Sequence, residues 1–515
     1  MAIIDTIDPE VLRGIVADWW HVLVVGSGAV YLTTKVIYRR FFHPLAKVPG
    51  PFLPAVTRLW AWYYNVPAEG KLFKEIERLH SIYGPIVRIT PDEVHLSDPA
   101  HYDYVYGVKS GFYKDHRFYG ALGIDVATFG SVSNEVHRRR RAALNPFFSR
   151  KKVLELEDIV HDKADKLCRI LHTNKEANKP TDIGAAFRAI SVDVVTDYAF
   201  GESWGQLDSP DLGAWFSDMV RGSSGMFFTL QAFPTLKFLH SLPPSIAKRM
   251  SPAVADFIGC QVRTLKHVAD VQQQVDQNIK PKRQTIFHQL MDPAAAEGHV
   301  VPRTADLADE AFAICTAAAD TTGNAMSMAA YRTITNPQIY ARVKKELEDA
   351  FSDASAELKF TELEKLPYLT GIIKEGQRLS YGVISRLPRV VPAGGATLEG
   401  FFIPAGYTVS MSSWMMHHNK DAFPDPETFD PDRWTDPSTF HERDKCLVPF
   451  SRGRRMCVGM NLAWCELYVT LGTLFRRFER LDTFDVGDED MVYQEYFSAF
   501  HPPDKRKFRV VVGAE

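Results

Sequence analysis

The sequence of 515 residues contains few cysteines, and the six that it has are scattered along the chain. They include no CxxC pair and no regular spacing of the kind that a disulfide framework or a zinc site requires. This scatter argues for a reducing compartment. The cysteines are Cys168, Cys260, Cys315, Cys446, Cys457 and Cys465.

The chain also lacks a strong charge of either sign, since its formal net charge is −3 at pH 7. No global basic character predicts binding to nucleic acid. Internal repeats and low-complexity segments are absent from the sequence, which excludes a repeat architecture. With 45% hydrophobic residues, the chain can form one large domain or two to three ordinary ones. We expect one domain over residues 52–515, because no later flexible linker separates its motifs.

A long uncharged run occurs near the N-terminus, where residues 19–34 carry no formal charge. A helix of about 20 residues over 19–38 would span roughly 30 Å, enough to cross a hydrocarbon core. Basic residues follow it and mostly acidic residues precede it, so residues 1–18 should be lumenal and the body cytosolic. A cleavable signal peptide is the rival interpretation, but it expects the opposite charge order and a small-residue cleavage site. We favour a retained transmembrane anchor, followed by a stiff linker over 39–51 with three prolines and a glycine.

The rest of the sequence is dominated by helical periodicity, with short strand-like runs, and predicts a mainly α body with a small β region. The longest predicted helix runs from Thr304, a plausible N-cap, to Thr335, and would span roughly 48 Å. The other predicted helices are 71–83, 136–148, 152–173, 183–199, 210–222 and 251–271. The predicted strands are 86–89, 94–96, 397–402, 408–411 and 508–512.

One cysteine has an unusual setting, in the run Phe-Ser-Arg-Gly-Arg-Arg-Met-Cys-Val-Gly over residues 450–459. Cys457 lies among glycines and arginines, before a mostly apolar stretch. Positive charge and backbone N–H groups stabilise a thiolate, and glycines let the backbone approach a flat macrocycle, so the run suits an axial ligand to haem iron. Arg455 would then meet a propionate. The alternative is a buried structural cysteine.

The pattern Phe-x-x-Gly-x-Arg-x-Cys-x-Gly resembles the haem-binding loop of the cytochrome P-450 monooxygenases. This resemblance implies a helix-rich triangular body with small sheets, haem b as the cofactor, and Cys457 as the ligand to its iron. Phe450, Arg455 and Gly459 would contact the haem. The linker at 41–51 likewise resembles the proline-rich hinge of microsomal members.

Asp320 and Thr321 lie on the long predicted helix, in the run Ala-Ala-Ala-Asp-Thr-Thr of residues 317–322. An acid beside a hydroxyl suits proton delivery to a bound oxygen species. Alternatively, the threonines bond back to the preceding turn of the helix. The run resembles the acid–alcohol pair of the family, with Ala318 in place of the usual glycine, and Ala318 and Thr322 would border the haem.

Glu375 and Arg378 are three residues apart, so they share one helix face in an apolar context. Burial of such a pair would require a second partner, which Arg433 could supply. The three resemble the family's Glu-x-x-Arg plus Arg triad, whose role is structural. His137 and Arg141, four apart, and Arg389 resemble the residues that hold the haem propionates, although His137 replaces the common tryptophan.

Basic residues at 138–140, 150–152 and 452 are expected to form a proximal surface on which an acidic reductase docks. In the family, the partner is NADPH-cytochrome P-450 reductase. The runs at 41–45, 137–141 and 144–149 resemble filamentous-fungal members of secondary metabolism, similar to the group around trichodiene oxygenase. We therefore expect a single-pass protein of the endoplasmic reticulum membrane.

The expected reaction is hydroxylation or epoxidation of an apolar secondary metabolite with O2 and NADPH-derived electrons. A terpenoid is the favoured substrate class. Polyketide and alkaloid intermediates stay open, as do a reductase-independent isomerase or peroxygenase and a non-enzymatic haem-binding protein. The stretch 225–233 fits either a membrane-dipping segment or core. Family topology implies that the substrate contacts Phe112–Phe129, Phe227–Phe238, Ala311–Ala319, Val383–Pro388 and Phe497–His501.

Overall fold

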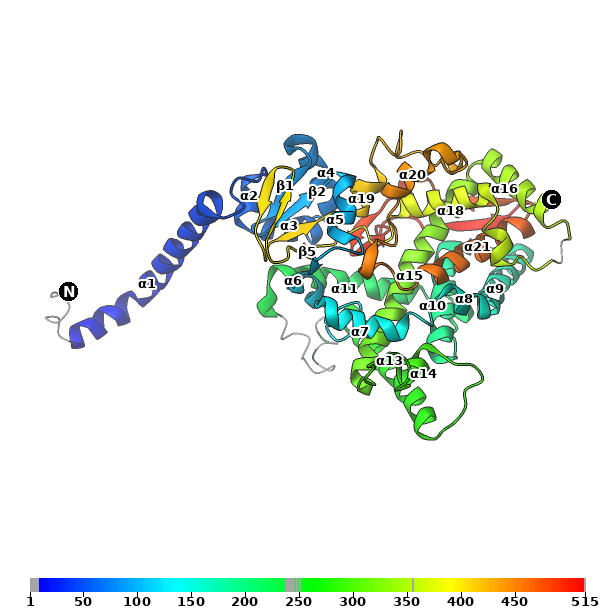
Figure 1. Ribbon diagram of the computed structural model, residues 1–515, viewed down its shortest axis with the longest axis horizontal. Coiled ribbons are helices and arrows are strands. Elements are labelled where there is room, and N and C mark those ends of the chain that lie inside the picture. The colour runs from blue at the N-terminus through cyan, green and yellow to red at the C-terminus, as the bar shows by residue number, and fades with distance from the viewer. Residues whose placement is uncertain (1–8, 237–245, 247–248, 250–251, 354–355, 514–515) are drawn as a thin grey trace.

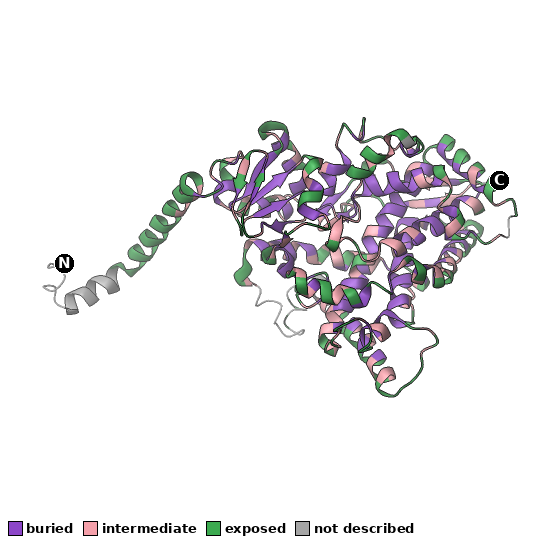
Figure 2. Cartoon of the chain, viewed as in Figure 1, coloured by how far each residue is buried: buried purple, intermediate pink, exposed green. Residues whose placement is uncertain are grey.

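Helix α15 (Thr304–Ile334) crosses a helix-rich body and is buried over most of its length (Figures 1 and 2). The computed structural model describes residues 9–236, 246, 249, 252–353 and 356–513. Alanines along α15 let α10, α13, α18 and α21 pack closely around it. The chain is therefore built around one central helix.

The helices of this body follow the apolar patterns of the sequence. They are α7 (Asn134–Leu144), α8 (Arg150–Glu155), α9 (Glu157–Glu176), α10 (Ile183–Phe200), α11 (Ala214–Ala232), α13 (Pro252–Asp276), α14 (Ile286–Leu290), α16 (Pro337–Ala350), α17 (Phe360–Leu363), α18 (Pro367–Ser380), α19 (Ser413–His417), α20 (Pro437–Cys446) and α21 (Met460–Arg477). Short 3-10 turns are η3 (Pro99–His101), η4 (Gly120–Leu122), η5 (Gln206–Asp208), η7 (Pro431–Trp434), η8 (Gly453–Arg455) and η9 (Asp488–Asp490).

A mixed five-stranded sheet lies at the end of the body next to α1 (Pro9–Ile37), with the strand order β1-β2-β8-β5-β3 (Figure 1). The β2–β8 pair is parallel and the other neighbours are antiparallel. These strands are β1 (Ile86–Thr90), β2 (Glu93–Leu96), β3 (Tyr113–Lys114), β5 (Arg389–Val390) and β8 (Thr408–Ser410). Beside the sheet lie α2 (Phe52–Val56), α3 (Leu59–Asn65), α4 (Leu72–Tyr83), α5 (Tyr102–Tyr106) and α6 (His116–Tyr119).

Three smaller sheets complete the described β structure. One has the order β4-β12-β9 and the others are the hairpins β6–β7 and β10–β11. Their strands are β4 (Thr181–Asp182), β6 (Ala396–Leu398), β7 (Phe401–Ile403), β9 (Leu481–Phe484), β10 (Gln494–Tyr496), β11 (Ser498–Phe500) and β12 (Arg509–Val512). A mainly α fold with small sheets is thus confirmed.

Helix α1 projects away from the body, and its residues from 19 onward are mostly exposed (Figure 2). It continues into the π-helical turn η2 (Tyr38–Phe42). By length and composition, Trp19–Phe42 could cross a membrane. The helix stops before Pro44, and the linker then packs on the body: Leu45 is buried and Arg88 donates to the Arg39 carbonyl at 3.0 Å. The predicted lumenal segment 1–18 lies partly outside the described residues.

Several predicted boundaries were wrong for local reasons. Thr304 is the first residue of α15, and Arg303 precedes it without a side-chain cap. The helix predicted over 136–148 ends at Leu144: Asn145 still has helical dihedrals, but Pro146 has no backbone N–H with which to continue the hydrogen-bond ladder. The helix predicted over 152–173 is split at Leu156, and the strand predicted over 397–402 is a hairpin. The start predicted for 251–271, Ser251, lies outside the described residues.

Helix α11 differs most from its predicted span of 210–222, since it begins at Ala214 and ends at Ala232. It therefore includes the stretch whose role the sequence left open. Phe227 and Phe228 are buried in a cluster with Phe118 and Tyr119. In the described structure, this part of the stretch is core.

Candidate functional site

The loop that carries Cys457 is folded tightly between α20 and α21. The Cys457 amide donates to the Phe450 carbonyl at 2.9 Å, and the Met456 amide donates to the Gly453 carbonyl at 3.1 Å. Gly453 has a φ of +67°, and a Cβ there would lie 2.3 Å from the Tyr106 carbonyl oxygen. Glycine is thus required for the loop to pack against α5.

The thiol of Cys457 lies just before α21, whose N-cap is Gly459. Burial raises the pKa of this thiol, whereas the Gly459 backbone N–H and the Arg141 guanidinium lower it. Yet Cys457 retains accessible surface, unlike the other five cysteines. A sulfur set deep in the protein but accessible faces an internal space, so the alternative of a buried structural cysteine does not fit. Positive charge and a helix N-terminus are the setting that favours a thiolate.

The middle of α15 contributes a second accessible surface. Within the otherwise buried part of this helix over 310–331, Ala317 is exposed, and Thr316, Ala318 and Thr321 are half-buried. Positions 317 and 321 are four apart and share one face of the helix. Thr322 is buried. The helix therefore presents a narrow accessible stripe of small residues at its centre.

The two residues of the predicted acid–alcohol pair lie on different faces of α15. Asp320 is buried and accepts from Arg188 Nε of α10 at 3.0 Å and from Ser217 Oγ of α11 at 3.3 Å. Burial raises the pKa of this carboxyl, and Arg188 counteracts the rise. Its Oδ2 atom has no hydrogen-bond partner among the described residues. Gly323 allows the Arg188 side chain to lie close to α15, because a Cβ at position 323 would lie 2.6 Å from Arg188 Cγ.

Thr321 lies on the accessible stripe, and its hydroxyl donates to the Ala317 carbonyl at 2.9 Å. This is the back-bonded arrangement that the sequence offered as the alternative. Asp320 therefore faces an arginine, away from the accessible stripe on which Thr321 lies. A hydroxyl bonded to its own helix still has lone pairs and can rotate, so it can exchange partners when another acceptor arrives.

A cluster of cations lies near the Cys457 loop. Arg455 donates to the carbonyls of Ser131 at 2.5 Å and Val132 at 2.8 Å, while Arg389 donates to the Tyr119 hydroxyl at 2.6 Å. Arg141 donates to the Met456 carbonyl at 2.8 Å. All three arginines are bonded to neutral oxygens.

Two further basic residues, His137 and Lys114, lie beside these arginines, and the five residues Lys114, His137, Arg141, Arg389 and Arg455 are called the cation cluster, although His137 itself is neutral at pH 7. Burial, followed by Arg455 and Lys114, lowers the pKa of His137 to about 3. Burial, followed by Arg389 and Arg455, lowers the pKa of Lys114 well below its usual range. Among the described residues, no member has a carboxylate within ion-pair distance. Buried cations without counter-ions are unfavourable, so the cluster is suited to an anionic group such as a carboxylate.

Lys114 and its neighbour Tyr119 were missed by the sequence reasoning. Lys114 Nζ donates to the Phe129 carbonyl at 2.5 Å and lies 4.1 Å from the Tyr119 ring centroid. A single lysine between Tyr113 and Asp115, on a strand too short to show alternation, gave little signal. Arg188 was also missed, although it is the one basic residue of the apolar run 183–200.

Comparison with known proteins decides between these possibilities. Residues 49–508 match the family described as Cytochrome P-450. The chain belongs to the cytochrome P-450 family. A conidiogenone synthase of Penicillium rubens is 36% identical to it over 476 residues, with 92% of this chain and 94% of the relative covered.

Two further relatives are similar over nearly their whole length. A tryptophan 6-hydroxylase of Fusarium equiseti is 34% identical, with 92% of this chain and 94% of the relative covered. The cytochrome P-450 monooxygenase TRI4 of Fusarium sporotrichioides is 30% identical, with 91% and 90% covered. The chain is thus a P-450 monooxygenase of the fungal secondary-metabolism type, as its sequence predicted.

The family implies a haem with a thiolate ligand, and the residues of this P-450 fit one. Cys457 offers an accessible sulfur, the α15 stripe offers a surface of small residues, and the cation cluster lacks the acids that its charges require. Two propionates are the acids that a haem would bring. We infer that Cys457 would hold the iron, with Phe450 and Gly459 beside it, and that the cation cluster would hold the propionates.

The predicted triad of this P-450 is assembled. Glu375 and Arg378 on α18 are fully buried and form two hydrogen bonds, at 2.7 and 2.8 Å. Arg433 is more distant, with its Nε 3.8 Å from Glu375 Oε2. Glu375 also accepts from Trp434 Nε1 at 2.9 Å and from the Asp430 amide at 3.0 Å. Glu375 is thus hydrogen-bonded to Trp434 of η7 and to the Asp430 amide that precedes it, whereas Arg433 adds a longer ion pair and no hydrogen bond.

His417 was missed by the sequence reasoning and connects the triad to the cysteine loop. Its Nδ1 lies 2.8 Å from the Arg378 carbonyl, and its Nε2 accepts from the Val448 amide at 2.9 Å. The acceptor role of Nε2 assigns the proton to Nδ1, so the ring is neutral. Burial lowers the pKa of His417 to about 3. This histidine therefore couples the loop to α18.

The segments that family topology implied for substrate contact converge in this P-450. Phe497, between β10 and β11, lies 5.8 Å from Phe227 and 5.9 Å from Phe129, measured between ring centroids. The Ser385 amide donates to the Phe497 carbonyl at 3.2 Å, and the Thr128 amide donates to Glu310 of α15 at 2.6 Å. Residues 237 and 238 of the predicted segments lie outside the described residues.

Proposed function

We propose that this monooxygenase hydroxylates or epoxidises an apolar terpenoid of secondary metabolism. The observation that carries the proposal is the aromatic cluster of Phe118, Phe129, Phe227 and Phe497, together with the accessible stripe of α15. A surface of phenylalanine and alanine offers few polar groups, so it favours a hydrocarbon skeleton and holds it mainly by shape. The relative named as a conidiogenone synthase is consistent with such a skeleton.

The bound haem would supply activation of dioxygen and transfer of one oxygen atom to the substrate. We infer that this chain contributes a proton route, in which Asp320 is the buried carboxyl and Thr321 the hydroxyl on the accessible stripe. Arg188 and Ser217 hold Asp320 Oδ1, which leaves Oδ2 for a proton. Rotation of Asp320 or one intervening water would join it to Thr321.

The presence of this pair favours a monooxygenase over a reductase-independent isomerase or peroxygenase, and over a non-enzymatic haem-binding protein. A basic surface on which a reductase could dock also favours a monooxygenase. Among the basic residues that the sequence grouped, Arg150 pairs with Glu364, Lys152 with Glu155, and Arg452 with Asp103. Exposed residues without an ion pair in the described structure remain for an acidic NADPH-cytochrome P-450 reductase. They are Arg138, Arg139, Lys151 and Arg454.

The second substrate class is an alkaloid or polyketide intermediate, and the relative named as a tryptophan 6-hydroxylase supports it. A substrate amino acid would need charged partners in the pocket, and the aromatic cluster has none among its members. We place the enzyme on the endoplasmic reticulum membrane, with α1 as the anchor and the body in the cytosol, from the charge order that flanks α1.

The test is oxidation by the full chain, co-expressed with a fungal NADPH-cytochrome P-450 reductase. Terpene hydrocarbons, tryptophan and aromatic polyketides are supplied under oxygen-18 gas, with and without NADPH. We expect a terpene product that carries one labelled oxygen atom and forms only with NADPH. A product from tryptophan alone would contradict the terpenoid assignment, and turnover without reductase would contradict the monooxygenase cycle.

A further inference from the structure

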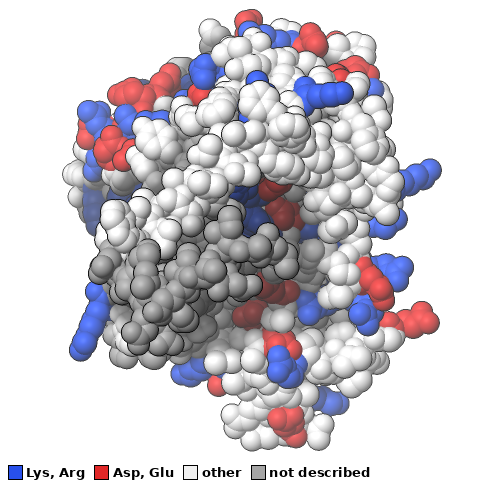
Figure 3. Space-filling model, turned by 90° about the vertical axis from the view of Figure 1, so that its left-hand side faces the viewer, with Lys and Arg blue, Asp and Glu red and all other residues white. Residues whose placement is uncertain are grey.

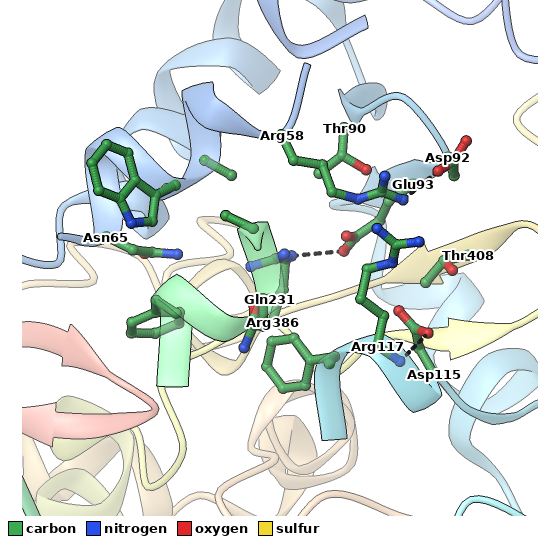
Figure 4. A pocket seen from close by; sticks show the side chains of 15 residues that line it. Arg58, Asn65, Thr90, Asp92, Glu93, Asp115, Arg117, Gln231, Arg386 and Thr408 are labelled. Atoms are coloured by element: carbon green, nitrogen blue, oxygen red, sulfur yellow. Dashed lines mark hydrogen bonds and ion pairs between the residues drawn. The ribbon is translucent and has the colours of Figure 1, made fainter. Parts of the chain in front are cut away.

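A pocket lies between the five-stranded sheet and the helices α3, α6 and α11 (Figure 4). Its cavity volume is about 40 Å³, and its mouth opens to solvent. Seen from the side of α1, the surface of the molecule is hollowed, and acidic and basic atoms lie within the hollow (Figure 3). The pocket contains no residue of the Cys457 loop or of α15. It is thus distinct from the surface that faces the cysteine.

The lining of this pocket combines aromatic side chains with charged and polar ones, which the aromatic cluster lacks. Arg386 Nε donates to Glu93 Oε1 at 2.7 Å, and both side chains are buried. Ser410 donates to the same carboxylate oxygen at 2.7 Å. Arg58 pairs with Asp92 at the rim. Each of these acids is matched by an arginine, so the two pairs bring no net charge to the pocket.

Four buried polar atoms that line the pocket have no hydrogen-bond partner among the described residues. They are Asn65 Oδ1, Thr90 Oγ1, Gln231 Nε2 and Arg386 Nη1. Their residues are 2%, 3%, 9% and 6% exposed. Figure 4 shows these residues arranged around one space. Each buried, unmatched group costs about 1–3 kcal/mol, so four around one pocket require polar partners from a bound molecule or from water.

The four atoms define what that molecule must offer. Arg386 Nη1 and Gln231 Nε2 are donors, Asn65 Oδ1 is an acceptor, and the Thr90 hydroxyl can act as either. A hydroxyl group both donates and accepts, and a carbonyl accepts two hydrogen bonds. The existing ion pairs balance the charge near Arg386, so a neutral ligand fits better than an anion.

We propose that this pocket binds the hydroxyl or carbonyl end of a neutral, already oxygenated small molecule. Phe118 lines the pocket and belongs to the aromatic cluster, and Phe228, which also lines the pocket, packs against Phe227 of that cluster at 5.0 Å between ring centroids. The apolar part of the same molecule would therefore lie against this shared aromatic wall. That its skeleton is a terpenoid rests on the proposed function, whereas the preference for oxygenated groups rests on the four atoms alone. The enzyme would then accept partly oxidised substrates and bind them by their oxygen atoms.

The experiment measures binding of a matched pair of probes, the sesquiterpene alcohol cedrol and the hydrocarbon cedrene, to the full-length haem protein. Equilibrium dialysis is performed with 4-phenylimidazole present, which blocks the iron and excludes binding at the haem. Two single variants, Thr90→Val and Gln231→Leu, each remove one unmatched polar group. Thr470→Val is the matched control, because Thr470 Oγ1 is also buried without a partner but lies on α21.

We expect cedrol to bind more tightly than cedrene and each pocket variant to weaken cedrol about 2- to 10-fold, the range for one lost hydrogen bond. Cedrene binding and the Thr470→Val protein should be unchanged. Equal binding of the two probes, or cedrol binding that neither pocket variant alters, would mean that water alone satisfies the four atoms and would overturn the proposal. If one variant fails to fold, the other decides. Cedrol bound here by a protein that oxidises no terpene would refute the proposed function and leave the pocket standing.

Discussion

His417 gives a sharp test of how the cysteine loop is held. The side chain is buried, donates to the Arg378 carbonyl and accepts from the Val448 amide. Replacement by leucine, His417→Leu, keeps most of the volume and removes both hydrogen bonds. Two buried backbone groups are then left unmatched at about 1–3 kcal/mol each, so we expect the free energy of unfolding to fall by about 2–6 kcal/mol at pH 7.5.

The pH dependence follows from the same contacts. Burial lowers the pKa of His417 to about 3 in the folded protein, whereas an unfolded histidine titrates near 6.5. The unfolded chain therefore binds the proton first, and the stability due to the neutral ring is complete above pH 6.5 and is lost as the pH falls toward 3. Between pH 7.5 and 5.5 the loss amounts to about 1.4 kcal/mol.

The assay is urea unfolding of the haem-bound protein at both pH values, followed by tryptophan fluorescence. Other buried histidines also titrate, so the quantity that matters is the difference in pH dependence between wild type and His417→Leu. We expect the variant to lose about 1.4 kcal/mol less than wild type over this interval. Replacement of the exposed His441 by leucine is the control and should keep the wild-type dependence. A wild-type pH dependence in His417→Leu would refute the reasoning.

Three further predictions concern the site itself. Thr321→Ala should lower the amount of product formed per NADPH several-fold while NADPH oxidation continues. The control is Thr335→Ala, which removes another back-bonded threonine at the end of α15 and should leave the product per NADPH unchanged. An unchanged ratio in Thr321→Ala would exclude Thr321 from the proton route. Glu375→Gln should lower the free energy of unfolding by about 3–5 kcal/mol and reduce the haem content of the expressed protein. Glu364→Gln, in a more exposed ion pair, should lower the free energy of unfolding by at most about 1 kcal/mol. Normal haem loading of Glu375→Gln would contradict the structural role of the triad. Lys114→Met should speed haem transfer to apomyoglobin, and an unchanged rate would exclude Lys114 from propionate binding.

Local sequence patterns were sufficient for much of this fold. The long helix was predicted to within one residue of α15, because alanines, a proline stop and a polar start coincide there. Strands such as β1 and β2 were predicted because they are apolar and β-branched. Boundaries failed at Pro146, which cannot donate the next helical hydrogen bond, and at Leu156, which leaves the helical region although the apolar period continues.

The candidate site was predictable where its residues lie within one motif, as in the Cys457 loop and the Glu375–Arg378 pair. Residues whose partners come from other segments of the chain were not predictable. Arg188, Lys114 and His417 acquire their roles through packing across 132, 15 and 31 residues of sequence. A periodic pattern reports which face of a helix is buried, but it does not report which charge on another element meets that face.

Thiolate ligation by Cys457 is the central claim, and the most direct test is a carbon monoxide difference spectrum of the dithionite-reduced protein. Wild type and Cys457→Ser are compared, with Cys446→Ser as a control for a buried cysteine outside the loop. The account predicts a strongly red-shifted Soret band in wild type and in the control, and its loss in Cys457→Ser. A band typical of histidine ligation in wild type, or an unchanged band in Cys457→Ser, would contradict it.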